Sequence, residues 1–192
     1  MSKKTIAIIT VLIALILDQA SKIYVKTHFE YQESVEVFSW FKLQFIENNG
    51  MAWGFEFGGK AGKLFLTLFR VVAVFGILYW LRNTIKRNAH TAVIVAISLV
   101  FSGAIGNIID SVFYGVIFDA PAHGVATLFA ENPYGELFYG RVVDMLYFPI
   151  YEGENFTFFN AIFNGADSFI TIGVALLFIF NKQAFPKEKK EE

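Results

Sequence analysis

The chain has 192 residues, of which 55% are hydrophobic and only 17% are charged. Soluble domains usually carry about 25% charged residues, so this composition is typical of a membrane protein. The formal net charge of −1 argues against a nucleic-acid partner, which requires a concentrated basic surface. Cysteine is absent, which excludes disulfides, a thiol nucleophile and a cysteine-based metal site.

Four apolar stretches each approach the roughly 20 residues needed to cross the hydrocarbon core of a bilayer. They cover about residues 5–25, 64–81, 91–109 and 164–181, and each predicts a transmembrane helix. The first stretch could be a cleaved signal peptide, but Asp18-Gln19-Ala20-Ser21-Lys22 is a poor small-residue cleavage site. On a continuing helix Asp18 and Lys22 would be neighbours, so we interpret this segment as a retained helix.

Lysine and arginine predict how these helices are oriented. Nine of the 16 basic residues lie in short segments on one side, whereas 14 of the 17 acidic residues fall on the other. Cytoplasmic loops carry an excess of Lys and Arg, so both termini and residues 82–90 are expected in the cytoplasm. Residues 28–63 and 110–163 would then lie outside. We expect one membrane domain over residues 1–192, with a cytoplasmic tail at 182–192.

The first outer segment has the pattern of β-strands. Residues 34–38 and 41–47 alternate between polar and apolar side chains and are rich in aromatic residues, and Asn48-Asn49-Gly50 follows as a turn signal. We therefore expect a small antiparallel sheet that lies on the outer surface of the bilayer.

The helix directions bring polar residues from distant parts of the chain to one membrane depth. An ionisable group at the head of a membrane helix, such as Asp167, is costly to hold and indicates a functional site. The residues that converge at the outer side are Asp18, Lys22, Asn48, Asn107, Asp110, Asp144, Asn164 and Asp167.

Asp144 and Asp167 suggest acid–base chemistry. If their carboxyl groups lie close together, mutual repulsion opposes double ionisation, so one pKa rises and the pair shares a proton. One carboxylate could then activate water while the other protonates the carbonyl oxygen or the leaving amine of an amide.

Such hydrolysis needs no cofactor, and we predict no metal, since the three histidines are too dispersed for a zinc site. Ser21 and Lys22 are adjacent, so on a helix they diverge and do not form a Ser–Lys dyad.

At these residues the chain resembles the prolipoprotein signal peptidases (signal peptidase II), a family of bacterial intramembrane aspartic proteases. Four motifs occur in the family's order along nearly the whole transmembrane body. They are residues 18–22, Asn48-Asn49-Gly50-Met51-Ala52-Trp53, Gly106-Asn107-Ile108-Ile109-Asp110, and the pair formed by Val142-Val143-Asp144 and residues 163–168.

The resemblance implies an all-α membrane protein with four transmembrane helices, a small antiparallel β-sheet and a short surface helix on the outer, periplasmic side. It implies that Asp144 and Asp167 form the catalytic dyad. The residues expected to bind substrate or support the site are Asn48, Gly50, Asn107, Asn164, Asp18, Lys22, Asp110 and Arg141.

The resemblance also implies the substrate and the location. The enzyme would cut lipid-modified prolipoproteins just before a cysteine that carries diacylglycerol, at the outer face of the bacterial inner membrane. A substrate anchored in the bilayer would reach the site laterally. The chain would contact membrane lipids and act as a monomer.

Two features depart from the family's pattern. The third motif commonly ends in Asp-Arg, whereas here Ser111 follows Asp110, and Arg141 is the candidate substitute for the missing guanidinium. Asp144 also lies 34 residues beyond Asp110, which is farther than usual, so residues 115–139 are interpreted as an insertion that could form a lid. Asp119 partly imitates the motif, but a loop sequence follows it, so we favour Asp144.

Three other functions remain open from the residues alone. A carboxylate-based ion or proton transporter would place polar residues at mid-membrane on several helices, yet the second helix offers only Thr67 and Arg70. A divalent-metal hydrolase could use Asp110, Asp144 and Asp167 as oxygen ligands. A purely structural membrane protein would leave the paired carboxylates unexplained.

Overall fold

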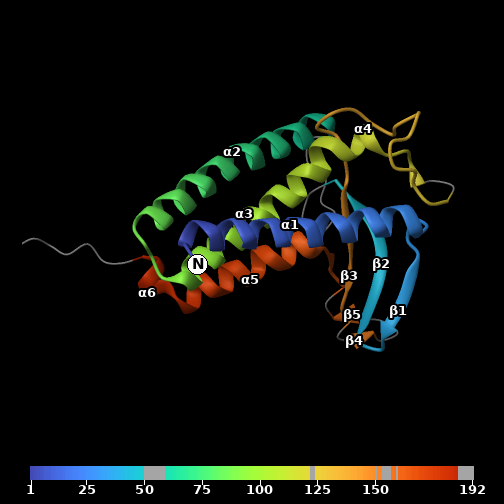
Figure 1. The fold of residues 1–192 in the computed structure, drawn as a ribbon. Coiled ribbons are helices and arrows are strands. Elements are labelled where there is room, and N and C mark those ends of the chain that lie inside the picture. Colours follow the sequence, from blue (N-terminus) through green and yellow to red (C-terminus); the bar gives the residue numbers. More distant parts are fainter. Residues whose placement is uncertain (50–58, 122–123, 150, 153–156, 159, 186–192) are drawn as a thin grey trace, which may run out of the picture.

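The computed structural model describes residues 1–49, 59–121, 124–149, 151–152, 157–158 and 160–185 (Figure 1). Helices α1 (Lys3–His28), α2 (Gly59–Lys86), α3 (Thr91–Ile109) and α5 (Gly165–Ile179) form an elongated bundle. A β-sheet stands across one end, here called the sheet end. The N-terminus and the short α6 (Asn181–Ala184) lie at the other, here called the α6 end.

Helix α3 does not stop at its predicted end. It continues through a π-helical turn, η2 (Asp110–Tyr114), into α4 (Gly115–Ile117). Helices α1, α2 and the continuous segment 91–117 are each long and apolar enough to cross a membrane, whereas α5 has only 15 residues. The described residues therefore contain three helices of spanning length and one shorter apolar helix.

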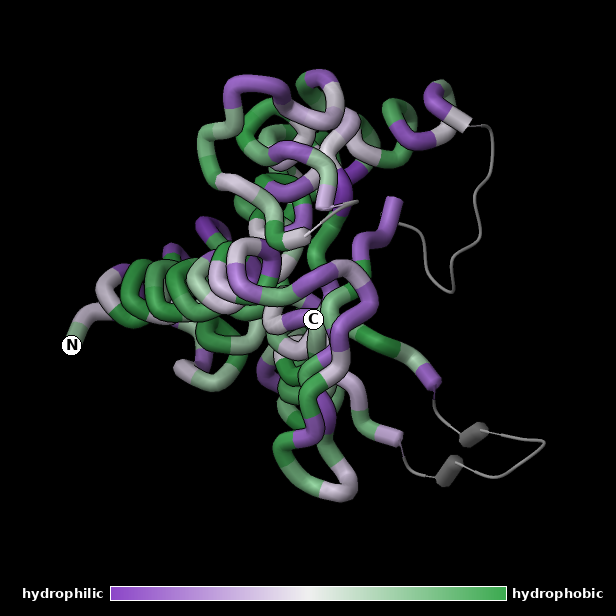
Figure 2. The backbone as a smooth tube through the Cα atoms, turned by 90° about the vertical axis from the view of Figure 1, so that its right-hand side faces the viewer, coloured by the Kyte–Doolittle hydropathy of each residue, from purple (hydrophilic) through white to green (hydrophobic). Residues whose placement is uncertain are grey.

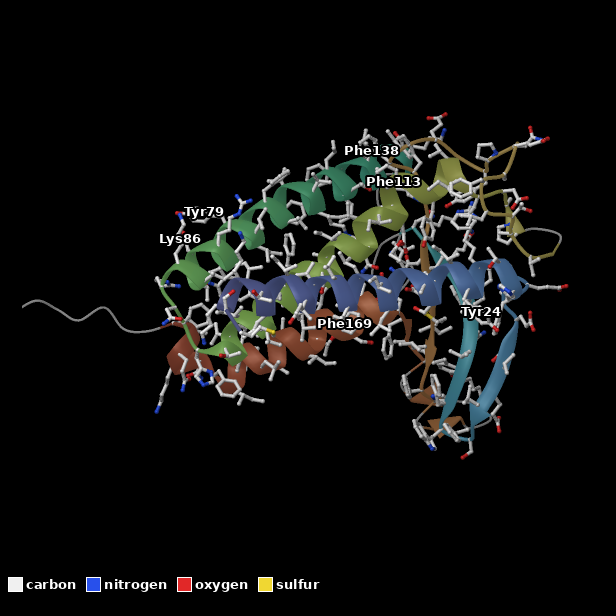
Figure 3. The ribbon with its side chains drawn as sticks, in the orientation of Figure 1. Tyr24, Tyr79, Lys86, Phe113, Phe138 and Phe169 are labelled. Carbon is white, nitrogen blue, oxygen red and sulfur yellow. The ribbon has the colours of Figure 1, made fainter. Side chains whose placement is uncertain are left out.

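The surface of the bundle is apolar, as a lipid-facing surface requires. Phe65, Val72, Phe75 and Phe178 each expose between 65% and 73% of their area. Figure 2 shows the helices predominantly hydrophobic, with hydrophilic stretches gathered in the connecting segments. In Figure 3 the exposed Tyr79 lies toward the α6 end.

Glycines allow α5 to approach α3 closely. A Cβ atom at Gly103 would collide with the carbonyl oxygen of Ala166 and with the Ile170 side chain, and one at Gly173 would collide with the Ala96 carbonyl. Small residues at such crossings let helix backbones approach within membranes. Gly103 and Gly173 therefore permit the close packing of α5 against α3.

The main sheet is antiparallel, in the order β1 (Ser34–Phe38), β2 (Phe41–Asn48), β3 (Val142–Tyr147), β6 (Ile162–Phe163). The two strands expected from alternation, β1 and β2, are confirmed. Strands β4 (Tyr151–Glu152) and β5 (Thr157–Phe158) pair separately. The short helices described here are α4, which continues α3, and α6, at the opposite end, so neither is the separate surface helix expected beside the sheet.

The register of β2 on β3 decides which side chains share a face. Ile46 lies opposite Asp144, Glu47 opposite Val143, and Asn48 opposite Val142. Because side chains alternate along a strand, Asn48 and Asp144 project from one face, while Glu47 and Val143 project from the other.

A hydrophobic core fills the second face of the sheet. It joins the last turns of α1 and the sheet to residues that follow α3, through Val25, Phe29, Phe45, Tyr114, Phe118, Ala126, Val143 and Met145. The predicted insertion folds back onto the helix end, because the amide of Gly135 donates to the Gly115 carbonyl and that of Gly140 to the Ser111 carbonyl, each at 2.9 Å. A separate core at the α6 end consists of Ala7, Leu81, Val93, Ile94, Ile97 and Ala184.

Candidate active site

Two aspartates and two asparagines meet where the bundle joins the sheet. Asp144 lies on β3, Asn107 near the end of α3, and Asn164 is the N-cap of α5, with Asp167 in that helix's first turn. The Asn164 amide donates to Asp144 Oδ1 at 2.6 Å, and the Asn107 amide donates to Asp167 Oδ1 at 2.8 Å. The Asn164 amide also donates to Asn107 Oδ1 at 3.2 Å, so a chain of hydrogen bonds joins the two carboxyl groups.

The two carboxyl groups have different surroundings. Asp144 is only 4% exposed, and burial raises its pKa to about 7, with the charge of Asp167 adding to the rise. Hydrogen bonds from Asn48 and Asn164 and the charge of Lys22 oppose this rise. Near neutral pH, Asp144 therefore carries a proton in a large fraction of molecules.

Asp167 is half-buried and is placed by the cap of its helix. Its backbone amide donates to Asn164 Oδ1 at 3.0 Å. The first turn of a helix carries unpaired amides and the positive end of the macrodipole, which stabilise a negative charge. The cap therefore fixes the position of Asp167 at the start of α5.

Lys22 orients one of the bridging asparagines. It is fully buried, and its Nζ lies 2.9 Å from Asn107 Oδ1, 3.0 Å from Asp18 Oδ2 and 2.9 Å from Asp110 Oδ2. Because Lys22 can only donate, it fixes the oxygen of the Asn107 amide toward itself and the nitrogen toward Asp167. The predicted pairing of Asp18 with Lys22 is confirmed.

Asp18 and Asp110 hold the backbone beside Asp167 and beside Asp144. Asp18 Oδ1 accepts from the backbone amide of Ala166, beside Asp167, at 2.7 Å. Asp110 Oδ2 accepts from the amide of Val143, beside Asp144, at 3.2 Å. Each carboxylate thus holds the backbone next to one member of the pair.

Gln19 and Arg70 also lie near the carboxyl pair or its supporting carboxylates, although no site role was predicted for them from the sequence. The Gln19 amide donates to both Asp18 and Asp110 at 3.0 Å, joining the two supporting carboxylates. Arg70, on α2, interacts with the charges of Asp167 and Asp144. Two signals pointed to them, since Gln19 lies inside the first motif and Arg70 is an arginine within a membrane helix.

Some of the predicted residues lie elsewhere. Arg141 was the candidate partner of Asp110, but its guanidinium donates to Glu47 at 3.1 Å, and Lys22 takes the place beside Asp110. Arg141 stands just before β3 begins, and continuing the alternation of β3 back by one residue places it on the side of Val143 and Glu47, opposite Asp144. Asp119 accepts from the Thr127 amide at 2.6 Å within the insertion, a local hydrogen bond. Gly50 lies outside the described residues.

The remaining predicted residue, Asn48, joins the pair from β2. Its amide donates to Asp144 Oδ2 at 3.3 Å, so both oxygens of Asp144 accept from asparagine. Over the described ranges, no group of three or more His, Asp or Glu side chains is arranged to hold a metal ion.

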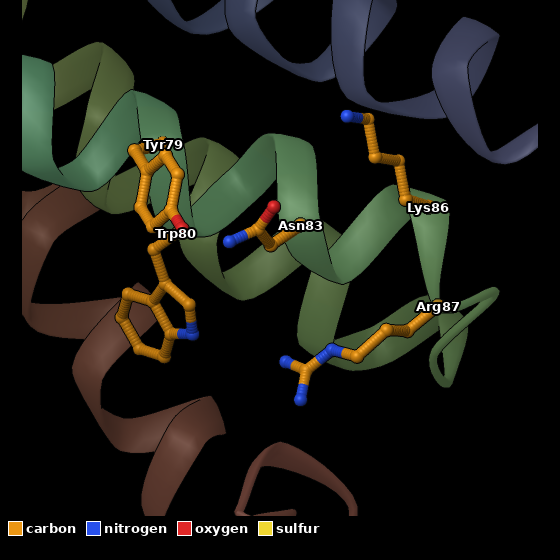
Figure 4. Close-up of a pocket in the computed structure, with 5 residues that line it drawn as sticks. All are labelled: Tyr79, Trp80, Asn83, Lys86 and Arg87. Carbon is orange, nitrogen blue, oxygen red and sulfur yellow. The ribbon is translucent and has the colours of Figure 1, made fainter.

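A surface hollow of about 430 Å³ lies at the far end of α2 from this site (Figure 4). It is lined by Tyr79, Trp80, Asn83, Lys86 and Arg87. These residues lie in the last turns of α2 and just after it, near the α6 end, and contribute nothing to the carboxyl pair.

The chain is similar to proteins named lipoprotein signal peptidase. One from Porphyromonas gingivalis (strain ATCC 33277) is 45% identical over 189 residues, with 92% of this chain and 82% of that protein covered. One from Amoebophilus asiaticus is 32% identical, with 90% and 75% covered. A bacterial membrane enzyme solved by the in meso method superposes with a TM-score of 0.63 at 28% identity, over 95% of this chain and 94% of that one.

The model of one protein family, described as signal peptidase (SPase) II, matches residues 10–182. This match covers most of the chain, including all four motifs and every described residue of the site. The chain belongs to the signal peptidase II family.

Proposed function

We propose that this protein is an aspartic endopeptidase that removes signal peptides from diacylglyceryl-modified prolipoproteins, cleaving before the lipidated cysteine. Family membership supports cleavage of prolipoprotein signal peptides. The observation that carries the aspartic mechanism is the hydrogen-bond chain that runs from Asp144 through Asn164 and Asn107 to Asp167.

The different surroundings of the two carboxyl groups support different roles for them. Asp144, with its raised pKa, holds the shared proton and acts as the acid, while Asp167 is the carboxylate base. Asp167 removes a proton from water as the water oxygen bonds to the scissile carbonyl carbon, and Asp144 donates its proton to the carbonyl oxygen. The C–N bond then breaks as the leaving nitrogen takes the proton held by Asp167, and the hydroxyl proton returns to Asp144.

The other polar residues position this pair. Lys22 and Asn107 set the direction of the hydrogen bond to Asp167, and Asp18 and Asp110 hold the backbones on either side. Pre-positioned groups lower the cost of reaching the transition state, because they need not reorganise when charge develops.

The protein would act in the bacterial inner membrane, with four helices crossing it and both termini in the cytoplasm. The sheet end then faces outward, and a lipid-anchored substrate enters from the bilayer at the depth of the carboxyl pair. This orientation rests on the distribution of Lys and Arg between the connecting segments.

The proposal is tested with Asp144→Asn and Asp167→Asn, each assayed for cleavage of a purified diacylglyceryl prolipoprotein. General acid–base groups contribute about 10²–10⁴-fold each, so each variant should lose at least about 100-fold in kcat. Asp119→Asn is the matched control and should retain full activity. A folded Asp144→Asn or Asp167→Asn variant with wild-type turnover would refute the mechanism, as would loss of activity in Asp119→Asn alone.

A further inference from the structure

A second group of charges lies behind the sheet, on the face opposite the carboxyl pair. Lys26, in the last turn of α1, is fully buried and forms an ion pair with Glu47 of β2, which is also buried. The other oxygen of Glu47 accepts from the Arg141 guanidinium at 3.1 Å. We call Lys26, Glu47 and Arg141 the Glu47 cluster; the mechanism proposed above does not use it.

The predicted insertion packs against the Lys26 part of this cluster. The Lys26 ammonium lies 5.0 Å from the ring centre of Phe118 and 5.1 Å from that of Tyr134, both from the insertion. The Ala126 amide donates to the Lys26 carbonyl at 3.1 Å, and the Arg141 amide donates to the Tyr134 hydroxyl at 2.7 Å. Aromatic faces stabilise a cation that has been removed from water, so the insertion makes the buried charge tolerable.

The cluster is linked to the carboxyl pair through the strands. Glu47 precedes Asn48, whose amide donates to Asp144, and Glu47 lies opposite Val143, which precedes Asp144. Arg141 stands just before β3 begins. Glu47 therefore binds α1 through one oxygen and the start of β3 through the other, while its own strand carries Asn48.

Stability alone explains such a cluster poorly. Removing two charges from water costs much of what their attraction returns, and apolar residues of similar volume are often as stabilising. An apolar pair, however, cannot form directional hydrogen bonds. The carboxylate of Glu47 accepts hydrogen bonds from two different elements, and this fixes how far β2 lies from α1 and β3.

We propose that Glu47, held by Arg141 and by Lys26, against which the insertion packs, is a positioning residue that sets the Asn48 amide against Asp144. It acts through Asn48 and touches neither substrate nor the reacting atoms. This inference rests on the proposed function, because it assigns Asp144 the role of the acid. It gives the insertion a role as a brace on the back of the sheet, in place of the lid expected from the sequence.

The test is a double-mutant cycle between Glu47→Gln and Asn48→Ala, with kcat, KM and their pH dependence measured on a diacylglyceryl prolipoprotein. Misplacing a catalytic group by about 1 Å can cost about 100-fold, so Glu47→Gln should lower kcat between 10- and 100-fold and leave KM unchanged. Glu36→Gln, an exposed glutamate on neighbouring β1, is the matched control and should behave as wild type.

The pH profile separates positioning from a purely structural role. Asn48 holds the pKa of Asp144 down, so losing its hydrogen bond moves the alkaline limb of kcat to higher pH. The charged groups around Asp144, namely Lys22, Arg70, Asp110 and Asp167, are unchanged in every variant. Asn48→Ala and Glu47→Gln should each move the alkaline limb of the kcat profile to higher pH. In the double variant this limb should move no further than in Asn48→Ala alone.

Independent, additive effects of Glu47→Gln and Asn48→Ala, or an unshifted limb in Glu47→Gln, would overturn the proposal. If Glu47→Gln does not fold, the variant with both Lys26→Met and Glu47→Leu replaces it, since it leaves no fully buried charge unpaired and the Arg141 side chain is 46% exposed to water. Wild-type kcat and pH limb in that variant would also overturn it. Failure of the proposed function is distinct, because Asp144→Asn would then retain turnover whatever the cycle gave.

Discussion

Both ends of the bundle are well packed, but they differ in the side chains that they bury. The core at the α6 end is hydrophobic, whereas the sheet end buries charged groups. At the α6 end, Ile94 and Ile97 of α3 are fully buried against Leu81 of α2. At the sheet end the same helix continues into Asp110, also fully buried, but against Lys22. One helix thus passes from a hydrophobic core into a network of charges.

The difference shows what a membrane enzyme must satisfy to keep a polar site. Burying a polar group costs free energy unless a hydrogen-bond partner replaces water. Within the described ranges, every buried side-chain nitrogen and oxygen has such a partner. Near the α6 end, buried polar side chains such as Thr84 and Ser98 are neutral hydroxyls that donate to carbonyls of their own helices. The sheet end instead retains buried charges by pairing them.

The largest expected effect is the loss of Lys22. Lys22→Met leaves Asp18 and Asp110 facing one another without their cation, and removing one partner of a buried ion pair costs about 3–5 kcal/mol. We expect a large loss of thermal stability in detergent, together with loss of cleavage. Lys3→Met, at the α6 end, is the control and should cost far less. Equal stability of the two variants would remove the distinction between the ends.

A slightly smaller effect is expected from Leu81→Ala at the α6 end. Truncating a buried leucine creates a cavity and costs about 2–5 kcal/mol in the free energy of unfolding. Because Leu81 is remote from the carboxyl pair, kcat per folded molecule should be unchanged. Chemical unfolding in detergent and an active-site titration measure the two quantities. A kcat that fell with stability would show that the two ends are coupled.

The sheet end should also weaken as pH rises. The pKa of Asp144 is about 7 in the folded protein against 3.8 for an ordinary aspartate, so the folded state binds the proton more tightly. Stability is then highest below about pH 4 with respect to this group, and it falls by a few kcal/mol as pH rises to 7. The free energy of unfolding should be measured for both proteins at pH 4 and pH 8. Asp144→Asn should gain stability relative to wild type only at pH 8. An equal difference at both pH values would contradict the raised pKa.

The smallest effect tests the close approach of α3 and α5. Gly103→Ala places a methyl group against the Ala166 carbonyl, and such overpacking costs about 1–3 kcal/mol. Ala166 precedes Asp167, so kcat should fall too. Gly76→Ala on α2, where a Cβ meets nothing within 4 Å, should be neutral or stabilising by about 1 kcal/mol. Equal free energies of unfolding for Gly103→Ala and Gly76→Ala would argue against the close approach of α3 and α5.

Hydropathy and alternation predicted much of the fold, but only where one pattern dominated. The apolar stretches located the helices, although α2 extends from residue 59 to 86 rather than 64 to 81, because helical hydrogen bonding continues past the apolar core. Strands β1 and β2 followed from alternation. Strand β3 was missed because it is buried almost throughout, on both faces, and so shows no alternation of polar and apolar side chains.

The residues of the site were easier to predict from the sequence than the hydrogen bonds that connect them. Helix direction predicted that Asn107 and Asp167 lie at one depth, and Asp144 was expected there from an outer segment. The hydrogen bonds of Asn107 and Asn164 join Asp144 and Asp167. The bridging of the two carboxyl groups by asparagines could not be predicted, because it depends on angles of approach between α3, α5 and β3. The expected pairing of Arg141 with Asp110 was wrong for a related reason, because the pairing of the missed strand β3 with β2 brings Arg141 beside Glu47.

Titrating the Asp144 carboxyl group tests most directly whether the two aspartates act as a pair. Infrared difference spectra of protein carrying labelled aspartate, recorded over a range of pH for wild type and Asp167→Asn, would report its protonation. Wild type should show a carboxyl group with a pKa near 7, and that pKa should fall in Asp167→Asn, because the charge of Asp167 helps to raise it. An ordinary aspartate titration in wild type, or the same pKa in both proteins, would contradict the account.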